Sequence, residues 1–155
     1  MPMTQAAPTV ANELTWSDGL LLGYAEMDNE HRELIARLLA LQQAAPDRMA
    51  QCLDEFTACA RQHFATEDAW MAETAFPPRE CHMDEHAAVL KSLDEVRERV
   101  AQGRPEPVPS LIDALVNWFP GHAHHLDSAL AAWMCKRRWD ARPVVLRRGA
   151  ARRAD

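Results

Sequence analysis

The sequence lacks the features that mark secreted, membrane-spanning and β-sheet proteins. Residues 1–13 contain neither the basic region nor the apolar core of a secretory signal, and no apolar run approaches the length of a membrane span. No segment alternates polar and apolar residues for long enough to indicate a strand. We therefore expect a cytoplasmic, all-helical protein without a membrane span.

The cysteines show no spacing that is typical of a metal or redox site. Cys52, Cys59, Cys81 and Cys135 form no C-x-x-C pair. A chain of 155 residues is large enough to fold as one domain without disulfides, so reduced thiols in a cytosol are expected. We interpret Cys52 and Cys59, which are spaced for one side of a helix, as buried thiols rather than a redox pair.

Charge is distributed unevenly along the chain. The formal net charge is −6, yet residues 136–155 contain Lys136, seven arginines and two aspartates and so carry +6. Residues 1–135 therefore carry −12, which is not the pattern of a nucleic-acid-binding domain. We interpret the basic tail as a solvated terminus; contact with nucleic acid, a membrane surface or the acidic body is the alternative.

Helix-starting and helix-breaking residues divide the chain into four helical segments. These cover residues 29–43, 48–74, 79–102 and the stretch from 110 onward. Asp28, Asp47 and Ser110 are the expected N-terminal caps. Short connections favour an all-α, antiparallel up-down-up-down four-helix bundle. We place this bundle at residues 14–135, with a flexible N-terminal arm at 1–13 and the basic C-terminal tail at 136–155.

Each expected helix carries a histidine on the line of residues that should face the core. In residues 79–102, His82 and His86 stand four apart and are followed at helical spacing by Val89. The corresponding lines of the other helices hold His31, His63 with Glu67, and His122.

Such a pattern requires a compensating interaction. Burying six ionisable groups without partners would outweigh the roughly 5–15 kcal/mol that stabilises a domain, so this set favours a metal site. Imidazole and carboxylate ligands without thiolates indicate iron, manganese or zinc. The number of ligands exceeds what one tetrahedral zinc ion uses, and the sequence thus predicts a dinuclear centre.

The ordered set of these residues resembles the hemerythrins, and more narrowly the bacterial single-domain hemerythrins. The resemblance covers roughly residues 14–134 and includes the segment LTWSDGLLLGYAEMDNEH and the FP pair after the second helix. Its motifs are His31; H-x-x-x-E at His63 and Glu67; H-x-x-x-H at His82 and His86; and H-x-x-x-x-D at His122 and Asp127.

The resemblance implies two iron ions per chain, bridged by an oxo or hydroxo group. The iron with two histidines would keep an open coordination position, at which the family binds dioxygen. Reversible dioxygen binding for storage, delivery or sensing is therefore the expected function, with dioxygen and a reductase or an oxygen-consuming enzyme as partners. The implied ligands are His82, His86 and His122 for one iron, His31 and His63 for the other, and Glu67 and Asp127 as bridges.

The resemblance also implies an oxygen pocket next to the iron ions. Each of its residues is equally well explained as an ordinary core residue of a bundle. Because Ala123 is smaller than expected at its position, a pocket lined by it would be larger and would favour ligand escape or auto-oxidation. The implied pocket residues are Leu34, Trp118, Phe119 and Ala123.

Spacing in the fourth helix does not by itself select Asp127. Five residues after His122 lie about 140° away around an α-helix, whereas His125 or Leu126 would face the site. The resemblance selects Asp127. We expect His124 and His125 to be exposed or to support the ligands from outside the site. The alternative is that either of them replaces or supplements a ligand.

Pro120 interrupts the hydrogen bonding of the same helix. It has no N–H to donate to the carbonyl of Val116, so we expect the helix to kink or open one turn before His122. This feature would adjust the position of His122, admit solvent to the site, or be a tolerated bend without a role.

Other classes of function compete with oxygen binding. An enzyme acting on peroxide, nitric oxide or ferrous iron would use the same site, but diiron oxidases in helical bundles use more carboxylates. The sequence therefore favours an oxygen-binding protein over an enzyme. A sensor would need a partner, for which the basic tail is the candidate surface. A bundle that binds zinc for stability is the last alternative.

Overall fold

The computed structural model describes residues 12–139 and residue 145. No strand occurs in this part of the chain. The long helices are α1 (Ala25–Gln42), α2 (Met49–Glu73), α3 (Arg79–Ala101), α4 (Val108–His122) and α5 (Ser128–Trp139). A short 3-10 helix, Asp18–Leu20, precedes α1, and a π-helical segment, Ala123–Asp127, joins α4 to α5.

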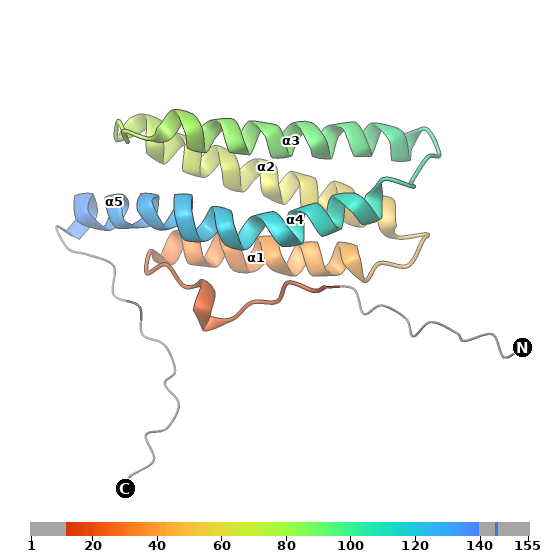
Figure 1. The fold of residues 1–155 in the computed structure, drawn as a ribbon, viewed down its shortest axis with the longest axis horizontal. Helices are drawn as coiled ribbons and strands as arrows, with labels where there is room; N and C mark the ends of the chain where they lie inside the picture. The colour runs from red at the N-terminus through yellow and green to blue at the C-terminus, as the bar shows by residue number, and fades with distance from the viewer. Residues whose placement is uncertain (1–11, 140–144, 146–155) are drawn as a thin grey trace, which may run out of the picture.

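The helices form a four-helix bundle, as predicted. Helix α1 packs against α2 and α4, and α3 packs against the same two helices. The π-helical segment joins α4 and α5 end to end, so that they make up the fourth rod of the bundle (Figure 1). Consecutive rods run antiparallel because the connections between them are short. No helix in the described part is long and apolar enough to cross a membrane.

The three predicted helix caps are wrong, because the helices begin elsewhere. Helix α1 begins at Ala25, and the carboxylate of Asp28 accepts hydrogen bonds from the backbone N–H groups of Leu22 and Gly23 at 2.9 and 3.1 Å. Asp28 therefore holds Leu22 and Gly23 against the first turn of α1 and does not cap the helix. Asp47 lies two residues before α2, which begins at Met49.

Helix α4 also begins earlier than predicted. Its first residue is Val108, and Pro109 follows in the first turn, where a proline needs no N–H partner. Ser110 therefore lies inside the helix instead of capping it. The predicted limits of the third helix agree with α3. Gly103, which follows the end of that helix, is left-handed (φ 75°). Its neighbour Arg104 donates its N–H to the carbonyl of Arg99 at 2.9 Å.

Two apolar clusters fill the bundle on either side of a polar layer. The first contains residues Leu34 to Leu41 of α1 and Leu111 to Phe119 of α4, and the second contains Met27 of α1 and Leu130 of α5. Between them lie buried histidines and carboxylates. The core is thus divided by a layer of polar groups that cross the whole bundle.

The segment before α1 lies along the bundle (Figure 1). The guanidinium of Arg32 sits 4.8 Å from the ring centroid of Trp16, and Gln42 donates a hydrogen bond to the carbonyl of Asn12 at 2.9 Å. At the other end, α5 runs to Trp139, inside the range predicted as tail. Residues 1–11, 140–144 and 146–155 lie outside the described residues, as do most of the predicted arm and tail.

Candidate metal centre

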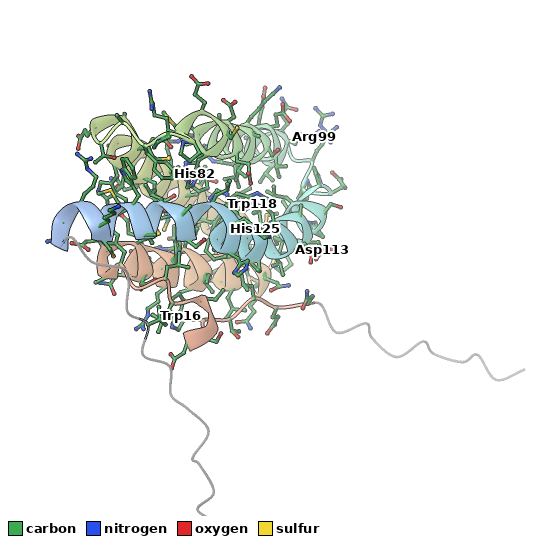
Figure 2. The ribbon with its side chains drawn as sticks, turned by 60° about the vertical axis from the view of Figure 1, so that its left-hand side comes forward. Trp16, His82, Arg99, Asp113, Trp118 and His125 are labelled. Carbon is green, nitrogen blue, oxygen red and sulfur yellow. The ribbon has the colours of Figure 1, made fainter. Side chains whose placement is uncertain are left out.

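The structure brings all seven predicted ligand residues together in the polar layer. Every rod of the bundle contributes, because each helix turns the line that carries its histidine inward. His82, for example, lies between α3 and the fourth rod, with its ring centroid 4.9 Å from that of His122 (Figure 2). None of the seven exceeds 4% exposure: His31, His63, Glu67, His82, His86, His122 and Asp127.

Three of the histidines gather around one side of the two carboxylates. The Nε2 atoms of His82 and His122 lie 2.9 and 3.1 Å from Oδ1 of Asp127. The Nε2 atom of His86 lies 3.2 Å from Oε1 of Glu67 and 3.3 Å from Nε2 of His122. Ligand atoms from all five residues lie within 4.8 Å of one another, which is close enough to hold one metal ion.

The other two histidines face the opposite oxygens of the same carboxylates. The Nε2 atom of His31 lies 3.1 Å from Oδ2 of Asp127, and that of His63 lies 3.1 Å from Oε2 of Glu67. His31, His63, Glu67 and Asp127 form a second group that could hold an ion. Each carboxylate therefore directs one oxygen to each group.

Most polar atoms at the centre of this layer have no hydrogen-bond partner in the described part of the chain. They include both oxygens of Glu67 and of Asp127 and the Nε2 atoms of His31, His63 and His82. In each group the ligand atoms lie within 4.8 Å of one another, yet the unpartnered atoms form no hydrogen bond among themselves. Because buried polar groups are nearly always satisfied, the arrangement fits a site that holds cations.

A π-helical segment explains how Asp127 reaches the site. In the α-helix assumed for the sequence, a residue five positions after His122 would face away. The structure winds Ala123–Asp127 as a π-helix, whose wider turn has i→i+5 hydrogen bonds, such as that from the N–H of Ser128 to the carbonyl of Ala123. Residues five apart then lie on nearly the same side, and Asp127 joins His122.

The neighbours of Asp127 do not share its position. His124 and His125 are exposed, which agrees with the expectation for both. Helix α4 continues through Pro120 to His122, and the change in winding follows that residue. The predicted opening one turn before His122 is therefore wrong, whereas the predicted kink at Pro120 stays a prediction.

Electrostatics inside the layer favour ionised carboxylates and protonated imidazoles. Burial opposes a charge on His63, but the charge of Glu67 and the hydrogen bond to Glu30 outweigh it and raise the pKa to about 10. Burial likewise opposes protonation of His82, whose pKa the nearby carboxylates raise to about 9. Although burial favours a neutral acid, the adjacent imidazoles hold the pKa of Glu67 well below its ordinary value. Metal ions would therefore displace protons on binding.

Sequence reasoning missed three carboxylates that lie behind the histidines. The Nδ1–H of His63 donates to Glu30 at 2.8 Å, and the Nδ1–H of His86 donates to Asp68 at 2.7 Å. The one sequence feature that marks these carboxylates is their position, because each acidic residue is the direct neighbour of a predicted ligand.

The third of these carboxylates, Glu85, accepts two hydrogen bonds. The Nδ1–H of His122 donates to its Oε1 at 3.1 Å, and Nε1–H of Trp118 donates to the same oxygen at 2.9 Å. The Trp118 ring also stacks on His122, with centroids 4.3 Å apart. Trp118 thus connects the imidazole to the surface of the bundle.

An apolar cavity lies against the histidines on one side. Its aromatic wall residues touch the layer: Phe64 stacks on His86 with ring centroids 4.2 Å apart, and Phe119 meets His31 edge-on at 5.1 Å. The accessible volume is about 10 Å³, near the smallest that holds one water molecule. The lining residues are Leu34, Ile35, Leu38, Phe56, Phe64, Val89, Leu115, Trp118 and Phe119.

Three of the four predicted pocket residues line this cavity. They are Leu34, Trp118 and Phe119. Ala123 is buried in the first apolar cluster but is not part of the cavity wall.

The fold and the site together define an all-helical bundle with a buried cluster of histidines and carboxylates that could hold metal ions. Residues 22–134 match the model of the Hemerythrin HHE cation binding domain. The chain therefore belongs to the hemerythrin family, as its ordered motifs predicted.

The chain is also similar to several proteins named bacteriohemerythrin. One from Ralstonia nicotianae is 37% identical over 129 residues, which cover 83% of this chain and 94% of the relative. One from Stenotrophomonas maltophilia is 30% identical over 122 residues, 76% of this chain and 79% of the relative. One from Pseudomonas paraeruginosa is 24% identical over 120 residues, 74% and 77% of the two chains.

Proposed function

We propose that this chain binds dioxygen reversibly at a pair of iron ions. His82, His86 and His122 would hold one ion and His31 and His63 the other, with Glu67 and Asp127 bridging the two. When bound, a pair of ferrous ions supplies the two electrons that reversible dioxygen binding requires. The residues of the chain hold the ions, leave room for the ligand and exclude water.

The observation that carries this proposal is the division of the two carboxylates. Oε1 of Glu67 and Oδ1 of Asp127 face the three-histidine group, and Oε2 and Oδ2 face the two-histidine group. Binding of a single ion would not require a carboxylate to direct its second oxygen toward another buried group of imidazoles. The geometry thus supports two adjacent ions that share both carboxylates.

The two groups of ligands are unequal, which supports an open position. One group offers five residues and the other four. Since iron bound by nitrogen and oxygen ligands favours six-fold coordination, the smaller group leaves more room for an external ligand. His31, a member of that group, meets Phe119 of the cavity wall edge-on. The same wall reaches the larger group through Phe64, which stacks on His86, so a small apolar molecule in the cavity would lie close to both groups.

The cavity wall supports carriage over catalysis. All of its lining residues are apolar or aromatic, and the Nε1–H of Trp118 is engaged by Glu85. The wall therefore offers no acid to donate a proton to a reduced oxygen ligand and little space for water. An enzyme acting on peroxide would benefit from such an acid.

The free thiols support a cytoplasmic location for this protein. The four cysteines are free, which suits a reducing compartment such as the cytoplasm. We retain the organisation into an arm, a bundle and a basic tail, but α5 extends the bundle to Trp139. A reductase or an oxygen-consuming enzyme is the proposed protein partner, and the sensor alternative would place the partner on the tail.

The decisive experiment is anaerobic reduction of the purified, iron-quantified full chain, followed by air and then argon, with visible spectra at each step. We expect a pair of iron ions per chain and a coloured adduct that appears with oxygen and fades on purging. Rapid irreversible oxidation with release or consumption of peroxide would favour the enzyme instead. A colourless, zinc-containing protein would overturn both.

A further inference from the structure

Three hydrogen bonds behind the histidines follow one pattern around the bundle. In each, an acidic residue directly beside a predicted ligand of one helix accepts the Nδ1–H of a histidine on the next helix. Glu30 of α1, beside His31, accepts from His63 of α2 at 2.8 Å. The bond therefore crosses the interface between α1 and α2.

The same relation recurs at the next two interfaces. Asp68 of α2, beside Glu67, accepts from His86 of α3 at 2.7 Å. Glu85 of α3, beside His86, accepts from His122 of α4 at 3.1 Å. Because the acidic residue and the ligand are neighbours in sequence, they leave their helix in different directions, one toward the surface and the other toward the centre.

The pattern stops at the fourth interface, between α4 and α1. In the described part of the chain, Nδ1 of His31 has no hydrogen-bond partner, and the same holds for Nδ1 of His82. We call a histidine anchored when its Nδ1–H donates to one of these carboxylates. Each group of histidines therefore contains one imidazole that is not anchored. His63 is the anchored member of the smaller group, whereas His86 and His122 are both anchored in the larger one.

The chemical effect of such a bond is specific. An Nδ1–H that donates to a carboxylate leaves the lone pair of Nε2 directed at the centre of the site, and the negative charge makes that nitrogen a stronger donor to a metal ion. The acceptors are accessible to solvent, with side-chain exposures of 30% for Glu30, 31% for Asp68 and 43% for Glu85. The histidines that donate to them are buried. Each histidine therefore depends on this bond, whereas its acceptor is also accessible to water.

We propose that Glu30, Asp68 and Glu85 are positioning residues that fix the orientation and the donor strength of His63, His86 and His122. This inference rests on the proposed function, because it assumes that the histidines bind iron. It goes beyond the ligand set by linking three of the five proposed metal–imidazole bonds to contacts between neighbouring helices. The two unanchored histidines, His31 and His82, would be the first to release the metal.

The test uses neutral variants of the three carboxylates in the full chain, namely Glu30→Gln, Asp68→Asn and Glu85→Gln. Matched controls are Glu33→Gln on α1 and Glu95→Gln on α3, since these carboxylates are exposed and form ion pairs with Arg37 and Lys91 at the surface. Each protein is loaded anaerobically with Fe²⁺. We would then measure iron release to a ferrous chelator, the reduction midpoint potential and the urea stability of the metal-free protein.

We expect each neutral variant to release iron about 10–100-fold faster than the wild type and to have a more positive midpoint potential, because a negative charge that favours ferric iron is gone. The controls should match the wild type in all three measurements. The metal-free positioning variants should still unfold cooperatively in urea, with Glu30→Gln less stable because the Glu30 charge stabilises protonated His63. Variants with an alanine at these positions should release iron faster still, since they lack even a neutral acceptor.

The outcomes separate this inference from the proposed function. If the wild type retains iron while the three variants release it at the wild-type rate with unchanged potentials, the positioning role is wrong and the proposed function stands. Equal acceleration in the two controls would also overturn the positioning role, since surface charge alone would then explain the effect. If the wild type takes up no iron, the proposed function fails, and this inference fails with it.

Discussion

Glu67 and Asp127 are the residues on which the proposed pairing of two ions depends. Both are fully buried, and their four oxygens lack hydrogen-bond partners in the described part of the chain. A buried carboxylate without partners is strongly unfavourable, so these side chains are the best positions at which to test for bridging.

We predict that Glu67→Gln lowers the iron content to half or less of the wild-type value. An amide offers one oxygen acceptor and a nitrogen that donates, so it cannot direct an oxygen to both groups. Iron per chain would be measured after anaerobic loading and gel filtration. Glu73→Gln, an exposed position at the end of the same helix, is the control. A full iron content in Glu67→Gln would contradict bridging by this residue.

Leu34 tests whether the cavity protects the bound ligand. We predict that Leu34→Ala enlarges the cavity and costs about 2–5 kcal/mol of unfolding free energy. Water then enters more easily, so auto-oxidation should become several-fold faster. Leu93→Ala is the matched control because Leu93 is fully buried in the same apolar cluster but does not line the cavity. Equal auto-oxidation rates in the two variants would show that the cavity plays no such part.

At the scale of elements, the fourth rod is the irregular one. It changes from α-helix to π-helix and back within a few residues, and the π-helical part holds Asp127. Since π-helical turns are rare and unfavourable, the segment persists because α4 and α5 are both held by packing. Phe119 is buried in the first apolar cluster and Leu130 in the second, which fixes the ends between which the segment must wind.

We predict that Pro120→Ala raises the free energy of unfolding by about 1–3 kcal/mol, because an N–H inside the helix becomes available. Iron content should not change, since the π-helical winding follows His122 instead of preceding it. Pro109→Ala, in the first turn of the same helix, should bring no such gain. Urea denaturation would measure both. Loss of iron in Pro120→Ala would show that the proline sets the position of His122.

At the scale of the whole molecule, the polar layer links stability to pH. The pKa of His63 is raised to about 10 and that of His82 to about 9, above the ordinary value of 6.5. Their stabilising effect is therefore complete below pH 6.5 and disappears as the pH rises toward 10. The pKa values of Glu67 and Asp127 are lowered, so their effect is complete above their ordinary values and disappears in acid.

We predict that the metal-free protein is most stable between about pH 4.5 and 6.5 and loses stability toward pH 10. In the iron-loaded protein the loss of stability in acid should begin at a higher pH, since protons then compete with the metal for the imidazoles. Urea denaturation of chelator-treated and iron-loaded samples at several pH values would measure both trends. A metal-free stability that rises steadily with pH would contradict the charge distribution in the layer.

The sequence predicted the bundle and six of the seven buried ligand candidates through a single regularity. In α1, α2 and α3, histidines such as His31, His63 and His82 lie at helical spacing from apolar residues, so the pattern that buries the core also buries the imidazoles. Such periodicity depends only on the local helix. It is therefore readable without knowing which helices become neighbours. For Asp127 periodicity failed, and only the resemblance to a family selected it.

The remaining features depend on contacts between segments that are distant in the sequence. The π-helical winding at Ala123–Asp127 is unfavourable by itself and is set by the packing of both flanking helices. The hydrogen bonds that His63 donates to Glu30 and His122 donates to Glu85 join residues more than thirty positions apart, and the cavity is enclosed by side chains of four helices. Local spacing specifies which side of a helix faces inward, whereas the partners it meets there are fixed only when the helices pack.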